Sequence, residues 1–197
     1  MTNSMPRRLI LASTSVYRRE LLSRLRLPFL IARPEADESP SAGEAPRALA
    51  LRLAEMKARA VAGDYPDALI IGSDQVAYSE GRVYGKPGTR EKAIAQLEEL
   101  SGKVAFFDTA LCLLDAASGR SETVCVTTET RFRPLTREEI ERYVDADQPL
   151  DCAGAAKSES LGVALLEYMR SDDPTALIGL PLIELCRMLR ADGVQIP

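Results

Sequence analysis

Apolar and polar positions along the chain form short blocks that predict strands and helices in turn. The first block, residues 9–12, is a continuous apolar run, which is typical of a buried strand. The polar triplet Ser13-Thr14-Ser15 ends this run, and Leu21, Leu22 and Leu25 follow at helical spacing. Ser15 is a favourable N-cap, because its hydroxyl can accept a hydrogen bond from an unpaired N–H of the first turn. The pattern therefore predicts a strand, a turn and a helix at the start of the chain.

The same periodicities predict the elements of the remaining chain. Strands are expected at 29–32, 68–72, 76–79, 82–84, 104–114, 122–132 and 163–169. Helices are expected at 46–62, at 89–100 with Thr89 as cap, from the capping box at Thr136 to about 145, and at 182–190. Strands and helices alternate at first, and long consecutive strands occupy the middle. We expect an α/β fold with a mixed, partly antiparallel sheet flanked by helices. One elongated, two-lobed domain over residues 1–197 with a central cleft fits this order best.

Composition narrows the class of protein. The 197 residues carry a net charge of −4, which argues against a general nucleic-acid binder. No apolar run has membrane-spanning length, and charged residues from Arg18 onward interrupt any signal-peptide pattern. None of the four cysteines belongs to a CxxC pair, so we expect reduced, mostly buried thiols in a cytoplasmic protein. These cysteines are Cys112, Cys125, Cys152 and Cys186.

The sequence contains no histidine, which restricts the chemistry that it can perform. Acid–base steps must use Asp, Glu, Lys, Tyr or Cys side chains. Any metal held by carboxylates would be a hard cation, and Mg²⁺ and Mn²⁺ are the ions that fit.

Two arginines, Arg18 and Arg19, stand in the first turn of the first predicted helix. Cations oppose the helix dipole there, since that end of a helix favours negative charge. With Ser13 and Ser15 close by, the pattern is typical of a site that holds an anion. A capped surface helix with two solvated arginines is the alternative, and the residues alone leave both interpretations open.

Three further polar positions are candidates for chemistry. Asp74 follows the buried strand 68–72, and the carboxyl ends of strands are where open α/β sheets place functional residues. An ordinary turn aspartate is the alternative. Lys86 is presented by the rigid turn Gly85-Lys86-Pro87-Gly88. Lys57 would ordinarily be a solvated lysine, and residues 34–43 are expected to form a polar surface loop. The residues alone thus indicate a soluble α/β protein with a candidate anion site.

Eight short segments form an ordered set that covers almost the entire chain. They are Leu11-Ala-Ser-Thr-Ser-Val-Tyr-Arg-Arg-Glu-Leu-Leu22, Asp37-Glu38, Arg52-Leu-Ala-Glu-Met-Lys57-Ala, Gly72-Ser-Asp74-Gln, Gly85-Lys86-Pro, Leu100-Ser-Gly102, Cys152-Ala-Gly154 and Ile178-Gly-Leu-Pro181. In order and spacing this set resembles the Maf-like nucleotide pyrophosphatases. A single segment would be weak evidence for the resemblance, whereas the whole ordered set is specific to that family.

The details are most similar to the branch of that family that hydrolyses 7-methyl-GTP. Ser73-Asp-Gln75 stands where the dTTP/UTP branch has Ala-Asp-Thr, and Glu159 stands where that branch carries a glutamine. Three positions depart from the usual pattern. Val16 replaces a proline that would fix φ, Tyr17 stands where this branch often has tryptophan, and Ser160 replaces a glycine. None of these departures removes a charged residue expected to do chemistry.

The resemblance implies hydrolysis of a nucleoside triphosphate between its α- and β-phosphates. With 7-methyl-GTP the products are 7-methyl-GMP and pyrophosphate, which would clear a modified nucleotide. Glu38 and Asp74 would bind a divalent metal cation, and Asp74 would also orient and deprotonate the attacking water. The expected phosphate-binding residues are Ser13, Ser15, Arg18, Lys57 and Lys86, with Arg19 as a weaker candidate.

Base selection is expected from Tyr17, Gln75 and Glu159. Methylation at N7 gives guanine a delocalised positive charge, which a carboxylate can offset while it accepts hydrogen bonds from N1–H and the exocyclic amine. Glu159 suits this role, Tyr17 could add a cation–π contact, and Gln75 could read another edge of the base or the ribose. For Tyr17, a packed surface aromatic is the alternative.

Two other functions stay open from the sequence. One is a pyrophosphatase of the same family that acts on dTTP, UTP or other nucleotides, and Gln75 and Glu159 argue against it. The other is a nucleotide-binding regulator of cell division or septum formation, and the intact Asp74 and Glu38 argue against it. The expected partner is a nucleoside triphosphate, without nucleic acid or membrane, and a homodimer is left open.

Overall fold

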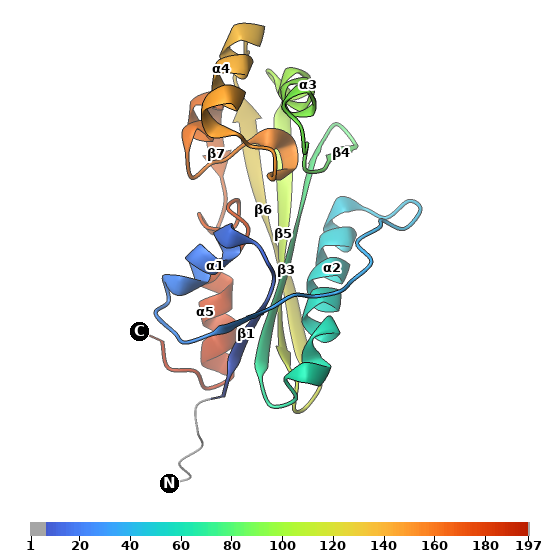
Figure 1. Ribbon diagram of the computed structural model, residues 1–197, viewed down its shortest axis with the longest axis vertical. Helices are drawn as coiled ribbons and strands as arrows, with labels where there is room; N and C mark the ends of the chain where they lie inside the picture. Colours follow the sequence, from blue (N-terminus) through green and yellow to red (C-terminus); the bar gives the residue numbers. More distant parts are fainter. Residues whose placement is uncertain (1–6, 197) are drawn as a thin grey trace. The chain divides into compact units, whose positions relative to one another are not determined.

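A seven-stranded mixed sheet runs through residues 7–196, which are the residues that the computed structural model describes (Figure 1). β1 pairs in parallel with β2 and β3, whereas the β3–β4 and β6–β7 pairs are antiparallel. The prediction of an α/β fold with a mixed, partly antiparallel sheet is confirmed. The strand order is β2 (Leu30–Ala32), β1 (Leu9–Ala12), β3 (Leu69–Ser79), β5 (Val104–Asp115), β6 (Ser121–Phe132) and β7 (Leu166–Arg170), with β4 (Arg82–Tyr84) paired to β3.

The chain divides into two compact units. The first contains the described parts of Met1–Asp74, Thr109–Val126 and Asp173–Pro197, and the second contains Gln75–Asp108 and Thr127–Asp172. β3, β5 and β6 each pass from one unit into the other, and Asp74 is the last residue of the first unit on β3. The single domain over residues 1–197 and its cleft between two lobes stay predictions.

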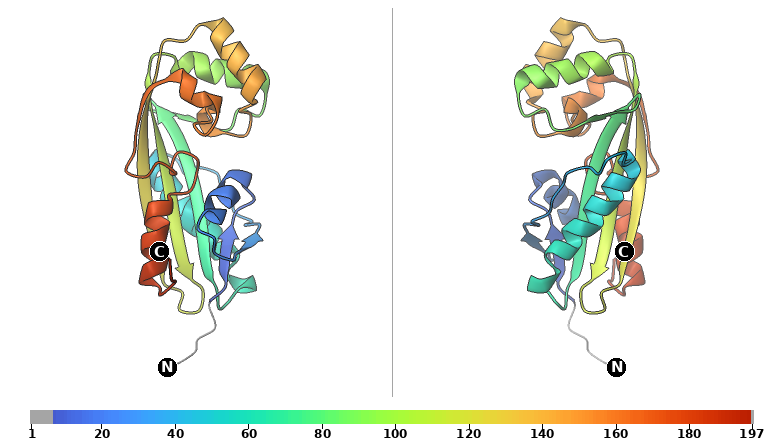
Figure 2. Two further views of the ribbon diagram at one scale, coloured as in Figure 1. Left: turned by 90° about the vertical axis from the view of Figure 1, so that its left-hand side faces the viewer. Right: turned by 90° about the vertical axis from the view of Figure 1, so that its right-hand side faces the viewer.

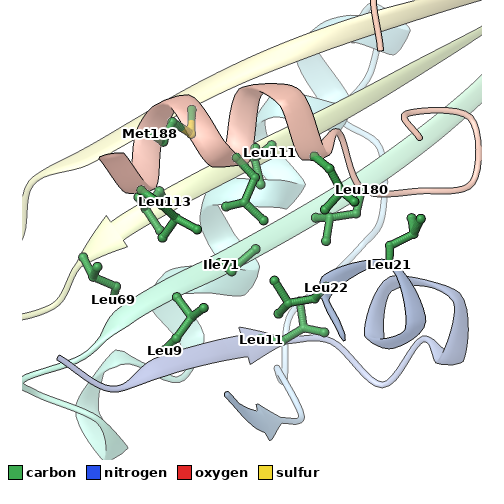
Figure 3. Close-up of a cluster of buried hydrophobic side chains, with 13 residues drawn as sticks. Leu9, Leu11, Leu21, Leu22, Leu69, Ile71, Leu111, Leu113, Leu180 and Met188 are labelled. Atoms are coloured by element: carbon green, nitrogen blue, oxygen red, sulfur yellow. The ribbon is translucent and has the colours of Figure 1, made fainter. Parts of the chain in front are cut away.

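Helices cover both faces of the strands in the first unit (Figure 2). Alternate residues of a strand point to opposite faces. Leu9, Leu11 and Ile71 therefore pack on one side against leucines of α1 (Val16–Ser23) and α5 (Leu182–Ala191), as Figure 3 shows. The other side meets α2 (Pro46–Ala60). Because both faces are covered, β1 is apolar at every position, and each fully buried leucine contributes about 1.5–3 kcal/mol.

Helix starts were predicted well, because their caps are local. Ser15 Oγ accepts a hydrogen bond from the Arg18 N–H at 3.4 Å, which confirms Ser15 as the N-cap of α1. Thr89 caps α3 (Arg90–Leu100), and Thr136 with Glu139 forms the predicted capping box of α4 (Arg137–Asp147). Among residues 7–196, no helix combines the length and the hydrophobicity needed to cross a membrane.

Ion pairs join α3 and α4 in the second unit. Arg90 Nε lies 2.6 Å from Asp145 Oδ1, and Arg137 Nη1 lies 2.7 Å from Glu98 Oε1. Exposed pairs of this kind contribute little to stability individually, so the apolar faces of the two helices matter more. The turn at Glu80-Gly81 closes the predicted β3–β4 hairpin.

Two predicted strand boundaries are wrong. The strands predicted at 68–72 and 76–79 are parts of one strand, β3, which runs from Leu69 to Ser79, so Asp74 lies within the strand and not past its carboxyl end. The polar residues Ser73-Asp74-Gln75 are accommodated within the strand. Ser73 Oγ, for example, lies 2.8 Å from Ala110 O, which satisfies the buried hydroxyl. The predicted strand at 163–169 is also wrong at its start, because Leu161–Leu165 forms a 3-10 helix before β7 begins.

The four cysteines are free thiols, as predicted for reduced residues. The expectation that most are buried is wrong, since only Cys112 among them is buried and the other three are half-buried. Cys112 sits on β5 inside the first unit, and burial raises the pKa of its thiol to about 11. This thiol therefore stays protonated at neutral pH, and the side chain serves to fill space in the core.

Candidate active site

A buried lysine joins two carboxylates in the first unit. Lys57, in the last turn of α2, places Nζ 2.6 Å from Asp74 Oδ1 and 2.9 Å from Glu38 Oε1. The side chains of Lys57 and Asp74 are only 8% and 11% exposed, whereas that of Glu38 is 59% exposed. The expectation of a solvated lysine is wrong, because a buried ammonium needs paired charges and this one has two. Three residues singled out by the resemblance therefore lie together.

Gly72 lets α2 approach β3 closely enough for this contact. A β carbon at Gly72 would lie 2.1 Å from Ala54 O and 2.9 Å from Ala58 N, both in the backbone of α2. Side chains two residues apart on a strand share a face, so Asp74 faces α2 as well. The absence of a side chain at position 72 therefore sets the distance at which Lys57 reaches Asp74.

Glu38 lies on a loop that is tied to α2. Arg52 forms a bidentate ion pair with Glu44, with Nε–Oε1 and Nη2–Oε2 distances of 2.7 Å. Arg52 also donates to Ser39 O at 3.1 Å, and Glu44 accepts from the Ser41 N–H at 2.9 Å. Arg52 and the Ser41 N–H together lower the pKa of Glu44 from 4.5 to about 2. The loop that was expected to be merely solvated is therefore an ordered frame beside Glu38.

Arg18 approaches the same carboxylates from α1. It is half-buried, and its Nε donates a hydrogen bond to Gly179 O at 2.8 Å. Burial lowers the pKa of the guanidinium, and the charges of Asp74 and Glu38 act in the opposite direction. Arg18 therefore lies in the electrostatic field of the two carboxylates.

The other predicted residues of this segment differ in exposure. Ser13 is buried and its Oγ accepts from the Ser15 N–H at 3.1 Å, so both serines serve as local caps. Tyr17 is half-buried, and Arg19 is exposed. The capping contacts explain the serines without a ligand, and their phosphate-binding role stays a prediction.

Three predicted site residues belong to the second unit. Gln75 is half-buried on β3, Lys86 is exposed after β4, and Glu159 is exposed in the segment after α4. Their predicted roles, phosphate binding for Lys86 and base selection for Gln75 and Glu159, stay predictions.

The segment that carries Glu159 is anchored to the end of α4. Lys157 Nζ donates to Asp147 O at 2.8 Å and to Gln148 O at 3.2 Å, where the helix leaves carbonyls unpaired. Ser160 Oγ donates to Asp147 Oδ1 at 2.6 Å, so the residue that departs from the usual glycine has its own partner. Desolvation is the main cause that raises the pKa of Glu159 above its ordinary value.

Two residues of the site were missed by the sequence reasoning. Ser73 Oγ lies 2.9 Å from Gly179 O, the same carbonyl that Arg18 Nε contacts. Gly179 has a φ of +127°, a region that residues with a side chain rarely adopt. The motif Ile178-Gly-Leu-Pro181 was a signal for this position, but no role could be assigned to it without the fold.

Glu38 and Asp74 fit a hard divalent cation. Their carboxylates converge on one positive charge, the Lys57 ammonium, and carboxylate oxygens suit Mg²⁺ and Mn²⁺. No group of three or more His, Cys, Asp or Glu residues able to hold a metal occurs in the part of the chain that the structure describes. Two carboxylates suffice for Mg²⁺ in many sites, because water and substrate phosphate oxygens complete its coordination.

Comparisons with known proteins agree on one family. A family model described as Maf-like protein matches residues 8–192. A curated protein of Aromatoleum aromaticum is 55% identical over 190 residues, which cover 96% of this chain and 98% of that relative. Relatives from Paraburkholderia xenovorans and Albidiferax ferrireducens are 57% and 50% identical, and cover 95% and 100% of this chain and 93% and 98% of their own lengths. All three are named 7-methyl-GTP pyrophosphatase.

Proposed function

Because this chain belongs to the Maf-like family, we propose that it hydrolyses 7-methyl-GTP to 7-methyl-GMP and pyrophosphate. The observation that carries this proposal is the shared name of relatives that are 50–57% identical over nearly the whole chain. The carboxylate pair around Lys57 supports it, because these are groups that phosphoryl chemistry needs and the chain has no histidine.

Asp74 is the proposed general base. Its Oδ1 takes the hydrogen bond from Lys57, which leaves Oδ2 to accept a proton from water. As that proton moves, the water oxygen bonds to the α-phosphorus, and the bond from this phosphorus to the bridging oxygen breaks. The bridging oxygen leaves with pyrophosphate. Positioned proton transfer of this kind contributes about 10²–10⁴-fold to rate.

A set of cationic and hydroxyl side chains is proposed to hold the triphosphate. Arg18 is the best-supported member of this set. It lies in the electrostatic field of Asp74 and Glu38, the two proposed catalytic carboxylates, and its guanidinium can offer two parallel N–H donors to phosphate oxygens. Ser13, Ser15 and Lys86 complete the proposed set, with Arg19 as the weaker member. Lys57 contacts both carboxylates, which favours a role in organising them over direct phosphate binding.

Glu38 and Asp74 are the residues proposed to hold Mg²⁺ or Mn²⁺. Such a cation, when bound, neutralises charge on the phosphate oxygens. The chain's own part is to present two hard carboxylate ligands on a strand and on a braced loop, with Lys57 compensating their charge in its absence.

Glu159 is proposed to select the methylated base. A carboxylate offsets the positive charge of 7-methylguanine, and a glutamine would not. Tyr17 and Gln75 are proposed to assist, Tyr17 through its aromatic face and Gln75 through its amide. The anchoring of the Glu159 segment by Lys157 and Ser160 supports a fixed carboxylate at this position.

The test is a substrate panel assayed for pyrophosphate release. Purified full-length protein is incubated with 7-methyl-GTP, GTP, dTTP and UTP, with Mg²⁺ and separately with Mn²⁺. We expect the highest kcat/KM for 7-methyl-GTP. Preference for dTTP or UTP would overturn the assigned substrate, and binding of nucleotides without turnover would instead point to a regulator of cell division. Gel filtration of the same sample tests the homodimer, and cell fractionation tests the cytoplasmic location.

A further inference from the structure

Gly179 O is an acceptor in the first unit that two side chains share. It receives the Arg18 Nε–H at 2.8 Å from α1, and Ser73 Oγ lies 2.9 Å away on β3. Ser73 directly precedes Asp74 in the strand. One carbonyl thus links the helix that carries the proposed phosphate ligand to the strand that carries the proposed base.

We propose that Gly179 is a positioning residue whose carbonyl fixes the orientation of the Arg18 guanidinium toward the triphosphate. This inference rests on the proposed function for the identity of the substrate. The geometry that supports it is the contact between Arg18 Nε and Gly179 O. A guanidinium has five N–H donors. The bond through Nε uses one of these donors, and the four terminal N–H groups remain to form the fork that suits phosphate oxygens.

No carboxylate competes for those terminal groups, since no ion pair of Arg18 within 4 Å is found among residues 7–196. Asp74 and Glu38 act on Arg18 only as nearby charges. A neutral carbonyl can therefore orient this side chain without cancelling its charge. A carboxylate in the same place would hold the guanidinium more strongly but would weaken its attraction for an anion.

The loop that carries Gly179 is closed by a buried aspartate. Asp173 Oδ1 accepts from the Thr175 N–H at 2.9 Å and lies 2.6 Å from Thr175 Oγ1, while Oδ2 accepts from the Ile183 N–H at 2.7 Å. Thr175 Oγ1 also accepts from the Leu182 N–H at 2.9 Å and lies 2.8 Å from Leu180 O. The Thr175 hydroxyl therefore contacts Asp173 at the start of the loop and Leu180 and Leu182 at its end, and it helps Asp173 to close the loop.

The backbone conformation at position 179 favours glycine. Its φ of +127° disfavours any residue with a β carbon. A β carbon there would lie 3.5 Å from Arg18 Nε and 3.7 Å from Arg18 Cγ, which are ordinary van der Waals distances, so the strain comes from the backbone conformation. The Gly179 N–H donates to Ala176 O at 2.9 Å, which holds the Ile178–Gly179 peptide on the N-terminal side of the carbonyl.

The experiment uses a double-mutant cycle on the full-length protein. Thr175→Val removes the hydroxyl that closes the loop, Thr175→Ser keeps it, and each is made with Arg18 and with Arg18→Ala. Affinity for inorganic tripolyphosphate is measured by calorimetry, and kcat/KM for 7-methyl-GTP is measured in parallel. We expect Thr175→Val to weaken tripolyphosphate binding about tenfold when Arg18 is present, and less than about twofold when it is absent. Thr175→Ser should recover most of the loss.

Gly179→Ala and Gly193→Ala provide a second comparison. Both glycines have positive φ, but nothing lies within 4 Å of a β carbon at Gly193. Both substitutions strain the backbone, and only Gly179→Ala should weaken tripolyphosphate binding in an Arg18-dependent manner.

Equal losses from Thr175→Val in the Arg18 and Arg18→Ala backgrounds would overturn the proposal, since the loop would then act through overall stability. Tripolyphosphate binding does not depend on turnover. A protein that cleaves no nucleotide but shows the Arg18-dependent loss would reject the proposed function and leave the role of Gly179 standing.

Discussion

Lys57 Nζ lies 2.6 Å from Asp74 Oδ1, so the proposed base already holds a cation on one of its two oxygens. Glu38 shares the same ammonium at 2.9 Å. Removal of one partner from a buried ion pair leaves the other charge uncompensated, which is costly. Lys57 and Asp74 are therefore a coupled pair, and substitutions at either position test both.

Asp74→Asn should lower kcat at least about 10²-fold, because asparagine keeps the shape but cannot accept the proton from water. Binding of tripolyphosphate should survive, since Arg18 and Lys86 remain. A pyrophosphate-release assay measures the loss of turnover, and calorimetry on the same preparation measures the binding of tripolyphosphate. Near-wild-type turnover by a preparation free of contaminating activity would exclude Asp74 as the base.

Lys57→Met should increase the affinity of the nucleotide-free protein for Mn²⁺ about tenfold, because it removes a positive charge from between the two carboxylates. Electron paramagnetic resonance of free Mn²⁺ measures this directly, without turnover. Lys92→Met, at an exposed lysine of α3, is the matched control. Unchanged Mn²⁺ affinity would show that the ammonium and the metal do not compete, and that Glu38 and Asp74 are not the metal ligands.

Gly72→Ala should destabilise the protein by about 3 kcal/mol, the upper end of ordinary overpacking, because the new methyl group meets backbone atoms of α2 at 2.1 and 2.9 Å. Displacement of α2 should also lower kcat by moving Lys57 away from Asp74. Urea denaturation and the pyrophosphate assay measure the two effects. Gly63→Ala, where nothing lies within 4 Å of the added carbon, is the control. Equal stability of both variants would contradict the close approach.

The contribution of Glu44 to the stability of the folded protein should be lost at acid pH. Arg52 is the main cause that lowers the pKa of Glu44 from 4.5 to about 2. A depressed carboxyl pKa adds stability above the unfolded value, and this stability disappears as pH falls through the folded value. The difference in Tm between wild type and Glu44→Gln should therefore be largest near pH 6 and vanish toward pH 2. Glu35→Gln, at an exposed acid of the same loop, gives the baseline, and a pH-independent difference would refute the assignment.

Glu159→Gln should lower kcat/KM for 7-methyl-GTP much more than for GTP, dTTP and UTP, because only the methylated base carries the charge that the carboxylate offsets. Tyr17→Ala should act in the same direction more weakly, within the roughly 0.5–2 kcal/mol of a cation–π contact. The readout is the ratio of kcat/KM values across the four substrates. Parallel losses on all of them would mean that these residues support the fold or the phosphates.

Local signals were sufficient for most of the fold. The apolar run of β1 and the cap at Ser15 depend on neighbours within a few residues, and both predictions are confirmed. The same holds for the capping box at Thr136. Elements whose boundaries are set by nearby residues are the ones that sequence patterns describe well.

Contacts between distant residues account for the errors. The sequence predicts that the strand ends before Ser73, because this hydroxyl has no partner nearby in sequence. Its partners in the fold, Ala110 and Gly179, lie 37 and 106 residues away. Lys57 was expected in solvent for the same reason, since its partner Asp74 is 17 residues away on another element. Family resemblance singled out Lys57 and Asp74, but the contact between them required the fold.

The leucine cluster of the first unit has a consequence for protein synthesis. Leu9 and Leu11 are made first, whereas Leu185 and Met188, which belong to the same cluster, are made near the end of the chain (Figure 3). A nascent chain therefore emerges from the ribosome with an uncovered apolar face until α5 is translated, and uncovered faces of this kind invite aggregation. Chains that terminate before α5 should consequently be chaperone clients or protease substrates, however complete their proposed catalytic residues are.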